Sequence, residues 1–128
     1  MLEKLIEQFG KEFNMKEEIL MTEDRHYKIP LDNGIEIETA ELERSCLLKG
    51  IIGSKPEKNV ESFLLKVMEA NLFGIGTRGG AIGLLEDGKQ LTYSLEIDNR
   101  GSYKNFKEKI EDFISVVDFW RKETLKHE

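Results

Sequence analysis

The sequence is poor in the residue types from which metal sites, disulfides and membrane spans are built. Its 128 residues include one cysteine, Cys46, and two histidines. A single cysteine excludes an internal disulfide, a multi-thiolate zinc site and a paired-cysteine redox motif. No apolar run approaches the roughly 20 residues that a membrane-spanning helix requires. These scarcities indicate no structural metal and no membrane insertion, and Cys46 is interpreted as a small core side chain.

The composition and the charge balance indicate a soluble domain that does not bind nucleic acid. Hydrophobic residues make up 39% of the chain and charged residues 34%, as in globular proteins with a solvated surface. The formal charge of −6 opposes binding to phosphate backbones. The length fits one domain over residues 1–128. Charges interrupt the apolar positions of residues 1–7, unlike a signal peptide, so a cytoplasmic protein is expected.

The first half of the chain has the periodicities of one helix and three strands. Apolar residues recur at helical spacing near the N-terminus, opposite a charged face. These residues are Leu2, Leu5, Ile6, Phe9 and Phe13. Residues 15–24 are ambiguous and are interpreted as the helix end and a loop. Strands are predicted at 26–31, 35–39 and 45–52, and a turn at residues 32–34 joins the first two.

A second helix is predicted after the third strand. Ser54 and Glu57 have the spacing of a capping box, so the helix is expected to begin there. Gly74 is the residue type favoured just past a helix end. The apolar stripe between these limits consists of Val60, Phe63, Leu64, Val67, Met68 and Leu72.

The remaining residues predict a hairpin and a final helix. Residues 81–85 and 90–97 flank a turn at 86–88, and the second arm alternates between apolar and polar residues. Ser102 can cap a helix whose apolar residues run from Phe106 to Trp120 at helical spacing. The order α-β-β-β-α-β-β-α is typical of an α+β domain in which helices cover an antiparallel sheet.

Residues 74–79 satisfy the G-x-G-x-x-G pattern of dinucleotide-binding folds. That motif requires a strand before the glycines and a helix after them, because the helix N-terminus binds the pyrophosphate. Here a helix is predicted before the glycines and a strand after them. The segment is therefore interpreted as a structural joint, and a small nucleotide-binding enzyme using residues 74–83 is kept as the alternative function.

Other candidate chemistry is weak. Residues 83–90 have the glycine and lysine spacing of a P-loop, but Gln90 replaces the hydroxyl residue that holds Mg²⁺. His26 and His127 lack metal-ligand spacing, and Cys46 has no adjacent base that would lower its pKa. Carboxylates such as Glu36 and Glu38 occupy a predicted solvent face, which disfavours a catalytic pair. No catalytic residue and no cofactor is predicted, so the chain is not expected to be an enzyme.

The apolar faces suggest a binding protein. Three helices with apolar stripes and five strands exceed what a small sheet is expected to cover, so a partner surface or self-association is predicted. The middle and last helices are interpreted as core. The first helix, with two phenylalanines on a short stripe, is expected to be the one that is open to a partner.

The sequence resembles the class I type III secretion chaperones, the group that includes the Tir chaperone. The most specific similarity is in residues 69–84, which match the family's helix end, glycine joint and following strand. The hairpin at 29–37 and the final helix with Phe106, Phe113 and Trp120 support it. Arg78 departs from the small residues expected in the joint.

The resemblance implies a homodimer that binds the N-terminal region of a secreted effector in the bacterial cytoplasm and keeps it export-competent without ATP. An extended client can add a strand to a sheet edge and place apolar side chains in adjacent grooves. The predicted effector-binding residues are Leu5, Ile6, Phe9, Phe13, Ile35 and Ile37. The predicted dimer-interface residues are Phe63, Leu64, Val67 and Met68. An orphan dimerisation module and a chaperone for parts of the secretion apparatus are the other possibilities.

Overall fold

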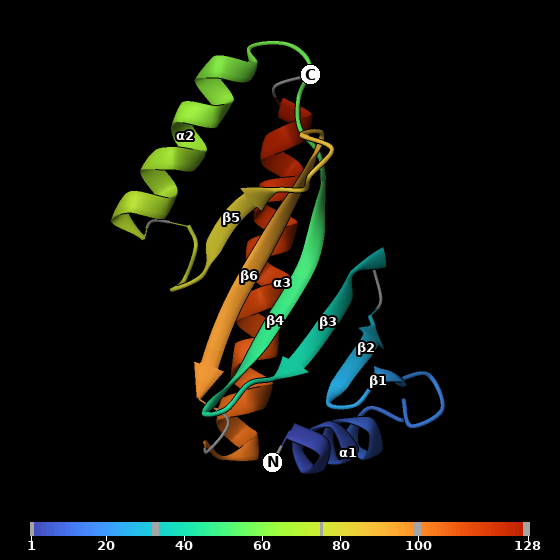
Figure 1. Cartoon of the computed structure of the whole chain (residues 1–128). Helices are drawn as coiled ribbons and strands as arrows, with labels where there is room; N and C mark the ends of the chain where they lie inside the picture. The colour runs from blue at the N-terminus through green and yellow to red at the C-terminus, as the bar shows by residue number, and fades with distance from the viewer. Residues whose placement is uncertain (1, 32–33, 75, 99–100, 127–128) are drawn as a thin grey trace.

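The computed structural model describes residues 2–31, 34–74, 76–98 and 101–126, which form three helices and six strands (Figure 1). The helices are α1 (Leu2–Glu12), α2 (Val60–Phe73) and α3 (Tyr103–Lys126). The strands are β1 (Leu20–Glu23), β2 (His26–Pro30), β3 (Glu36–Glu41), β4 (Ser45–Ser54), β5 (Ala81–Leu84) and β6 (Gln90–Asp98). Each strand pairs antiparallel with its neighbours in the order β1-β2-β3-β4-β6-β5, which confirms the α+β class.

Strand β1 lies in the segment that was expected to be a loop. Leu20 pairs with Lys28 and Met21 with Tyr27, so β1 forms one edge of the sheet. All four residues of β1 are exposed, and the strand therefore lacks the alternation of buried and exposed residues from which strands are predicted. The turn predicted at residues 32–34 lies partly outside the described residues. Across this turn, the Leu31 N–H donates a hydrogen bond to the Ile35 carbonyl at 2.8 Å.

Helix α3 runs along one face of the sheet, behind β4 and β6 in Figure 1. The ring of Phe113 packs against Tyr93 on β6, with ring centroids 5.1 Å apart. A Cβ atom at Gly50 on β4 would lie 2.9 Å from both the Phe113 ring and the Glu36 carbonyl. Gly50 therefore allows the helix to approach the sheet closely. Ser102 caps α3 as predicted, because its hydroxyl accepts a hydrogen bond from the Asn105 N–H at 3.1 Å.

The opposite face of the sheet is polar at its centre. Glu38 on β3 lies between Lys28 on β2 and Lys49 on β4 in the strand register. Lys28 is 3.9 Å from the carboxylates of both Glu36 and Glu38. These side chains are exposed or half-exposed, so the helices cover the sheet mainly on the α3 side.

Helix α2 begins later than the capping-box pattern predicts. Strand β4 extends to Ser54, which pairs with Gln90, and the Lys55 N–H donates to the Lys89 carbonyl at 2.8 Å. Pro56 disfavours a helical conformation at the residue before it, so the backbone stays extended there. The helix starts at Val60 after Asn59, whose side chain forms no cap hydrogen bond. The capping-box prediction is therefore wrong.

The glycine segment between α2 and β5 is a joint, as predicted. Gly74 ends α2 with φ of 71°, and Gly76 and Gly79 also have positive φ. The Trp120 ring N–H donates to the Gly76 carbonyl at 2.9 Å. Arg78 adopts φ of 45°, and its guanidinium lies 2.6 Å from the Asp112 carboxylate on α3. Arg78 thus ties the joint to α3.

Candidate functional site

The turn that has the spacing of a P-loop uses two backbone N–H groups to bind a carboxylate of the chain itself. The Asp87 carboxylate accepts hydrogen bonds from the Lys89 N–H at 2.8 Å and from the Gln90 N–H at 3.1 Å. These bonds hold the pKa of Asp87 below its ordinary value. The turn therefore carries its own anion, and residues 83–90 form the predicted hairpin turn.

The remaining candidates for chemistry are structural or exposed. Burial raises the pKa of the Cys46 thiol to about 11, so the thiol is a protonated core group. His26 is exposed and its ring hydrogen-bonds with the Asp24 carbonyl at 2.8 Å. His127 lies outside the described residues. In the described part of the chain, no group of three or more His, Cys, Asp or Glu side chains could hold a metal ion, and no helix is long and apolar enough to cross a bilayer.

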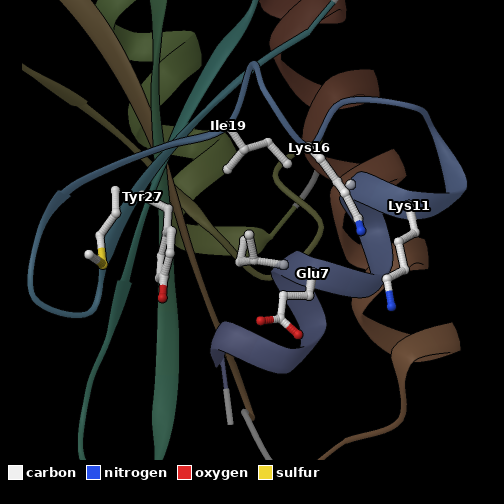
Figure 2. Close-up of a pocket in the computed structure, with 8 residues that line it drawn as sticks. Glu7, Lys11, Lys16, Ile19 and Tyr27 are labelled. Carbon is white, nitrogen blue, oxygen red and sulfur yellow. The ribbon is translucent and has the colours of Figure 1, made fainter.

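Two of the grooves beside helix α1 have apolar side chains in their lining. The first lies between α1, the segment after it and strands β1 and β2, and its volume is about 440 Å³ (Figure 2). It is lined by Ile6, Glu7, Gly10, Lys11, Lys16, Ile19, Met21 and Tyr27. In Figure 2, Tyr27 comes from the strand side, whereas Glu7, Lys11 and Lys16 border the hollow on the α1 side. The floor is apolar and the rim is charged.

The chain reversal after α1 forms the end of this groove. Asn14 adopts φ of 58°, and the Met15 N–H donates to the Gly10 carbonyl at 2.8 Å, as in a Schellman-type helix end. A Cβ atom on Gly10 would lie 3.4 Å from the Lys16 Cα atom and 3.5 Å from the Ile19 side chain. Glycine at this position therefore lets the returning segment lie close against the helix.

The second groove lies between the end of α1 and α3 and has a volume of about 690 Å³. Its apolar lining includes Phe9, Phe13, Met15, Leu31, Ile110 and Ile114. The rings of Phe9 and Phe13 are 4.7 Å apart, and the Lys107 ammonium lies 5.3 Å from the Phe13 ring centroid. Lys107 also forms an ion pair with Glu12 at 2.6 Å, which joins the two helices at the groove.

The apolar stripe of α1 is buried, contrary to the expectation that it is open to a partner. Leu5, Ile6 and Phe9 are all under 10% exposed, and Phe9 packs edge-on against Phe106 on α3. Ile35 and Ile37 are also buried in the core. Of the six predicted effector-binding residues, the structure brings Ile6 to the first groove and Phe9 and Phe13 to the second. Phe13 is the one residue of these six that is exposed, with 44% of its surface accessible.

The sequence pattern did not predict two exposed apolar residues of β1, one of which, Met21, lines the first groove. Leu20 and Met21 on β1 are 59% and 65% exposed, although both are apolar. Strand β1 pairs with β2 on one side, and the sheet order places its other side at the edge. The two adjacent apolar residues Leu20 and Met21 could have indicated a strand, but they were assigned to a loop.

Helix α2 presents a second apolar surface, on the side away from the core. Leu65, Met68, Leu72 and Phe73 are all at least 58% exposed. Among the four predicted dimer-interface residues, Phe63 and Val67 are buried within the chain, Leu64 is partly buried and Met68 is 66% exposed. The assignment of the α2 stripe to the core is therefore correct only for one side of the helix.

Specific side-chain contacts help to attach the inner side of α2. The Phe63 and Trp120 rings pack edge to face with centroids 6.2 Å apart. The Lys66 ammonium lies 2.5 Å from the buried Glu123 carboxylate, and this hydrogen bond is the main cause of the lowered pKa of Glu123. The Asn71 amide donates to the Ile82 carbonyl and accepts from the Ile82 N–H, both at 2.8 Å. Helix α2 is thus held to α3 and β5 by a few specific contacts.

Comparison with known proteins identifies the family of the chain. Residues 4–121 match the model of the Tir chaperone protein (CesT) family. Because this match covers most of the chain, the protein belongs to that family, and the resemblance seen in the sequence is confirmed. The family consists of chaperones, so the alternative of a nucleotide-binding enzyme has no support.

Individual relatives are distant in sequence and similar in fold. A protein of Chlamydia pneumoniae is 25% identical over 122 residues, which cover 94% of this chain and 93% of the relative. A chain of the HopA1–SchA chaperone–effector complex superposes with a TM-score of 0.74 at 16% identity, covering 94% of this chain and 93% of that one. A chain of the ExsC–ExsE complex superposes with a TM-score of 0.77 at 12% identity, and the match covers 96% of this chain and 92% of that one.

Proposed function

We propose that this protein is a single-domain chaperone, spanning residues 1–128, of the bacterial cytoplasm. It binds an extended N-terminal segment of a type III secreted effector and keeps that client soluble and export-competent without ATP. The proposal is supported by membership of the Tir chaperone family and by the chaperone–effector complex among the similar structures. The apolar-floored groove beside the free edge of β1 is the structural observation that carries it.

The groove and the strand edge suit an extended segment. A client strand can pair with the backbone of β1 while its alternate side chains enter the groove. Ile6 and Met21 contribute to the groove floor, and Phe9 and Phe13 offer a second apolar surface on the other side of α1. Leu5, Ile35 and Ile37 lie behind these surfaces, and we assign them the role of supporting the groove from the core.

A capture experiment with a matched pair of variants tests this function. Met21→Asp places a charge in the groove at an exposed position, so folding should be retained. Ile51→Asp is the control, because Ile51 is an exposed residue of β4 and does not line either groove beside α1. Each tagged protein is incubated with a native lysate without ATP, and the proteins that it retains are identified by mass spectrometry. The wild type and Ile51→Asp should retain a secreted protein. Met21→Asp should not retain it.

Two results would contradict the proposal. One is recovery of the same secreted protein by Met21→Asp and by the wild type. The other is capture that requires ATP, or measurable heat of binding to ATP or NAD in calorimetry, since the glycine joint has the wrong context for a nucleotide site.

We further propose that the functional unit is a homodimer that pairs through the exposed side of α2. Leu65, Met68 and Leu72 lie on one apolar surface of the helix that the single chain does not bury. A second copy of the same surface would remove these side chains from water in a two-fold interface. Leu64 and Met68 of the predicted interface set contribute to it directly, whereas Phe63 and Val67 anchor the helix from the core side.

Light scattering distinguishes the dimer from a monomer. Wild-type protein at micromolar concentration is expected to have the mass of two chains, and Met68→Lys is expected to have the mass of one. Leu20→Lys is the matched control, because Leu20 is similarly exposed but belongs to β1. A wild-type monomer, or a Met68→Lys variant that remains dimeric, would refute pairing through α2.

A further inference from the structure

The rim of the first groove carries two lysines that lack anionic partners. Lys11 on α1 and Lys16 on the returning segment are exposed, and neither forms an ion pair within the part of the chain that the structure describes. By contrast, Lys66 and Lys107 each lie within 2.6 Å of a carboxylate. Two cations without a carboxylate at ion-pair distance therefore lie on one rim of this groove.

The backbone holds these two lysines together. The close approach at Gly10 places the Cα atom of Lys16 against α1, one residue from Lys11 on the helix. Both lysines border the groove on the same side in Figure 2. A carboxylate beside this rim would be attracted by both ammonium groups.

Tyr27 lies on the strand side of the groove and is influenced by nearby carboxylates. The pKa of Tyr27 is raised first by burial and then by the carboxylates of Glu3, Glu41, Asp24 and Glu7. Apolar side chains of Ile6, Ile19 and Met21 also line the groove. The groove therefore has two lysines on its rim, an apolar floor and a tyrosine on its strand side.

We infer that the first groove selects an extended client segment in which an apolar side chain stands next to a carboxylate that contacts Lys11 and Lys16. This inference rests on the proposed chaperone function and adds the chemistry of the client. Charge complementarity of this kind discriminates between partners more than it adds affinity. The second groove supplies a contrast within the same molecule, because its charged lining includes Glu111 in addition to the paired Lys107.

A peptide-display selection tests the inference without knowledge of the natural client. Random 12-residue peptides on phage are selected against the intact wild-type protein and against Lys11→Glu/Lys16→Glu. The control is Glu111→Lys, which reverses a charge beside the second groove at a residue that lines neither hollow containing Lys11 and Lys16. Circular dichroism and light scattering confirm that each variant keeps its fold and mass.

Wild-type protein and the control should enrich peptides with Asp or Glu next to an apolar residue, and the lysine variant should enrich Lys or Arg there. A fluorescein-labelled copy of an enriched acidic peptide should bind the lysine variant about tenfold more weakly at low salt. The difference should shrink at high salt, because both lysines are exposed.

The inference is overturned if the wild type and the lysine variant enrich peptides of the same charge, or if neither enriches any peptide. Uncharged apolar peptides that bind the wild type and are lost with Met21→Asp would refute only the charge selectivity and leave the groove as a client site. The proposed chaperone function is judged separately, by the capture of a secreted protein described above.

Discussion

Helices α1 and α2 lie at opposite ends of the molecule and are attached to it in different ways (Figure 1). Helix α1 has one apolar stripe, which is buried, and a charged face in water. Helix α2 is apolar on more than one side, so a single chain buries one side of the helix and leaves Leu65, Met68, Leu72 and Phe73 exposed. A narrow stripe facing a charged side indicates core packing, whereas apolar residues around a helix indicate two partners.

The two helices also differ in what holds them. The anchors of α1 are mainly buried apolar side chains, reinforced by the ion pair between Glu12 and Lys107. Helix α2 combines a short row of buried apolar residues, including Phe63 against Trp120, with polar contacts to Glu123 and Ile82. Substitutions in the α1 anchors should therefore cost more free energy of unfolding than substitutions in the polar contacts of α2.

The largest effect is expected at the anchor of α1. Phe9→Ala should lower the free energy of unfolding by about 3–5 kcal/mol, because the ring is buried between α1 and α3. Phe13→Ala on the same helix end should cost distinctly less, since Phe13 is 44% exposed. Urea unfolding at one fixed protein concentration measures both. Equal losses would show that α1 is not anchored by burial.

The next effect is expected where the joint after α2 meets the sheet. A Cβ atom on Gly80 would lie 2.4 Å from the Ser94 carbonyl and 2.6 Å from the Tyr93 ring. Gly80→Ala should therefore cost about 1–3 kcal/mol by overpacking. Gly83→Ala is the control, because the nearest atom, the Thr92 hydroxyl, would be 3.5 Å away. Thermal unfolding of the pair measures the difference, and similar melting temperatures would contradict the close approach.

A smaller effect is expected from the polar contact of α2 with β5. Asn71→Ala removes two hydrogen bonds to the backbone of Ile82 and should cost about 1 kcal/mol, since water can reach this part-buried site. Hydrogen exchange of the Ile82 amide should accelerate. The neighbouring exposed Glu69→Ala serves as the control and should leave that amide unchanged. An unaltered exchange rate in Asn71→Ala would show that the contact does not secure β5.

The smallest effect is a dependence of α2 docking on acid. Lys66 holds the folded-state pKa of Glu123 below the ordinary value of 4.5. The ionised carboxylate therefore stabilises the folded protein above pH 4.5, and this contribution is lost as the pH falls through the lowered folded-state pKa. Urea unfolding between pH 6 and 3 should show a smaller pH-dependent loss for Glu123→Gln than for the wild type. Identical pH profiles would exclude Glu123 as a source of acid sensitivity.

The local sequence was sufficient to predict much of the fold. Periodicity predicted the three helices, and five of the six strands were located to within a few residues. The joint was recognised because Gly74 and the glycines after it follow a helical pattern and precede an alternating one. The start of α2 was missed because Ser54 pairs with Gln90, a partner 36 residues away in the chain. The edge strand β1 was missed because no burial pattern marks it.

The candidate site was less predictable than the fold. Phe13 was named in advance and is an exposed apolar residue, and Ile6 and Phe9 border the grooves although they are mostly buried. Met21 was not named, because its exposure depends on the position of β1 at the edge of the sheet. The place of Lys11 and Lys16 on one rim follows from the chain reversal at Asn14 and the contact at Gly10.

The sequence by itself determined the element types, the α+β class, the lack of disulfide chemistry and the resemblance to secretion chaperones. These properties depend on residue types and on the spacing of residues within one helix or strand, and both can be read directly from the sequence. The tertiary structure alone decided which apolar faces are core and which are open, because burial depends on partners that are distant in the chain. It placed the stripe of α1 in the core and left one side of α2 and the edge of β1 exposed.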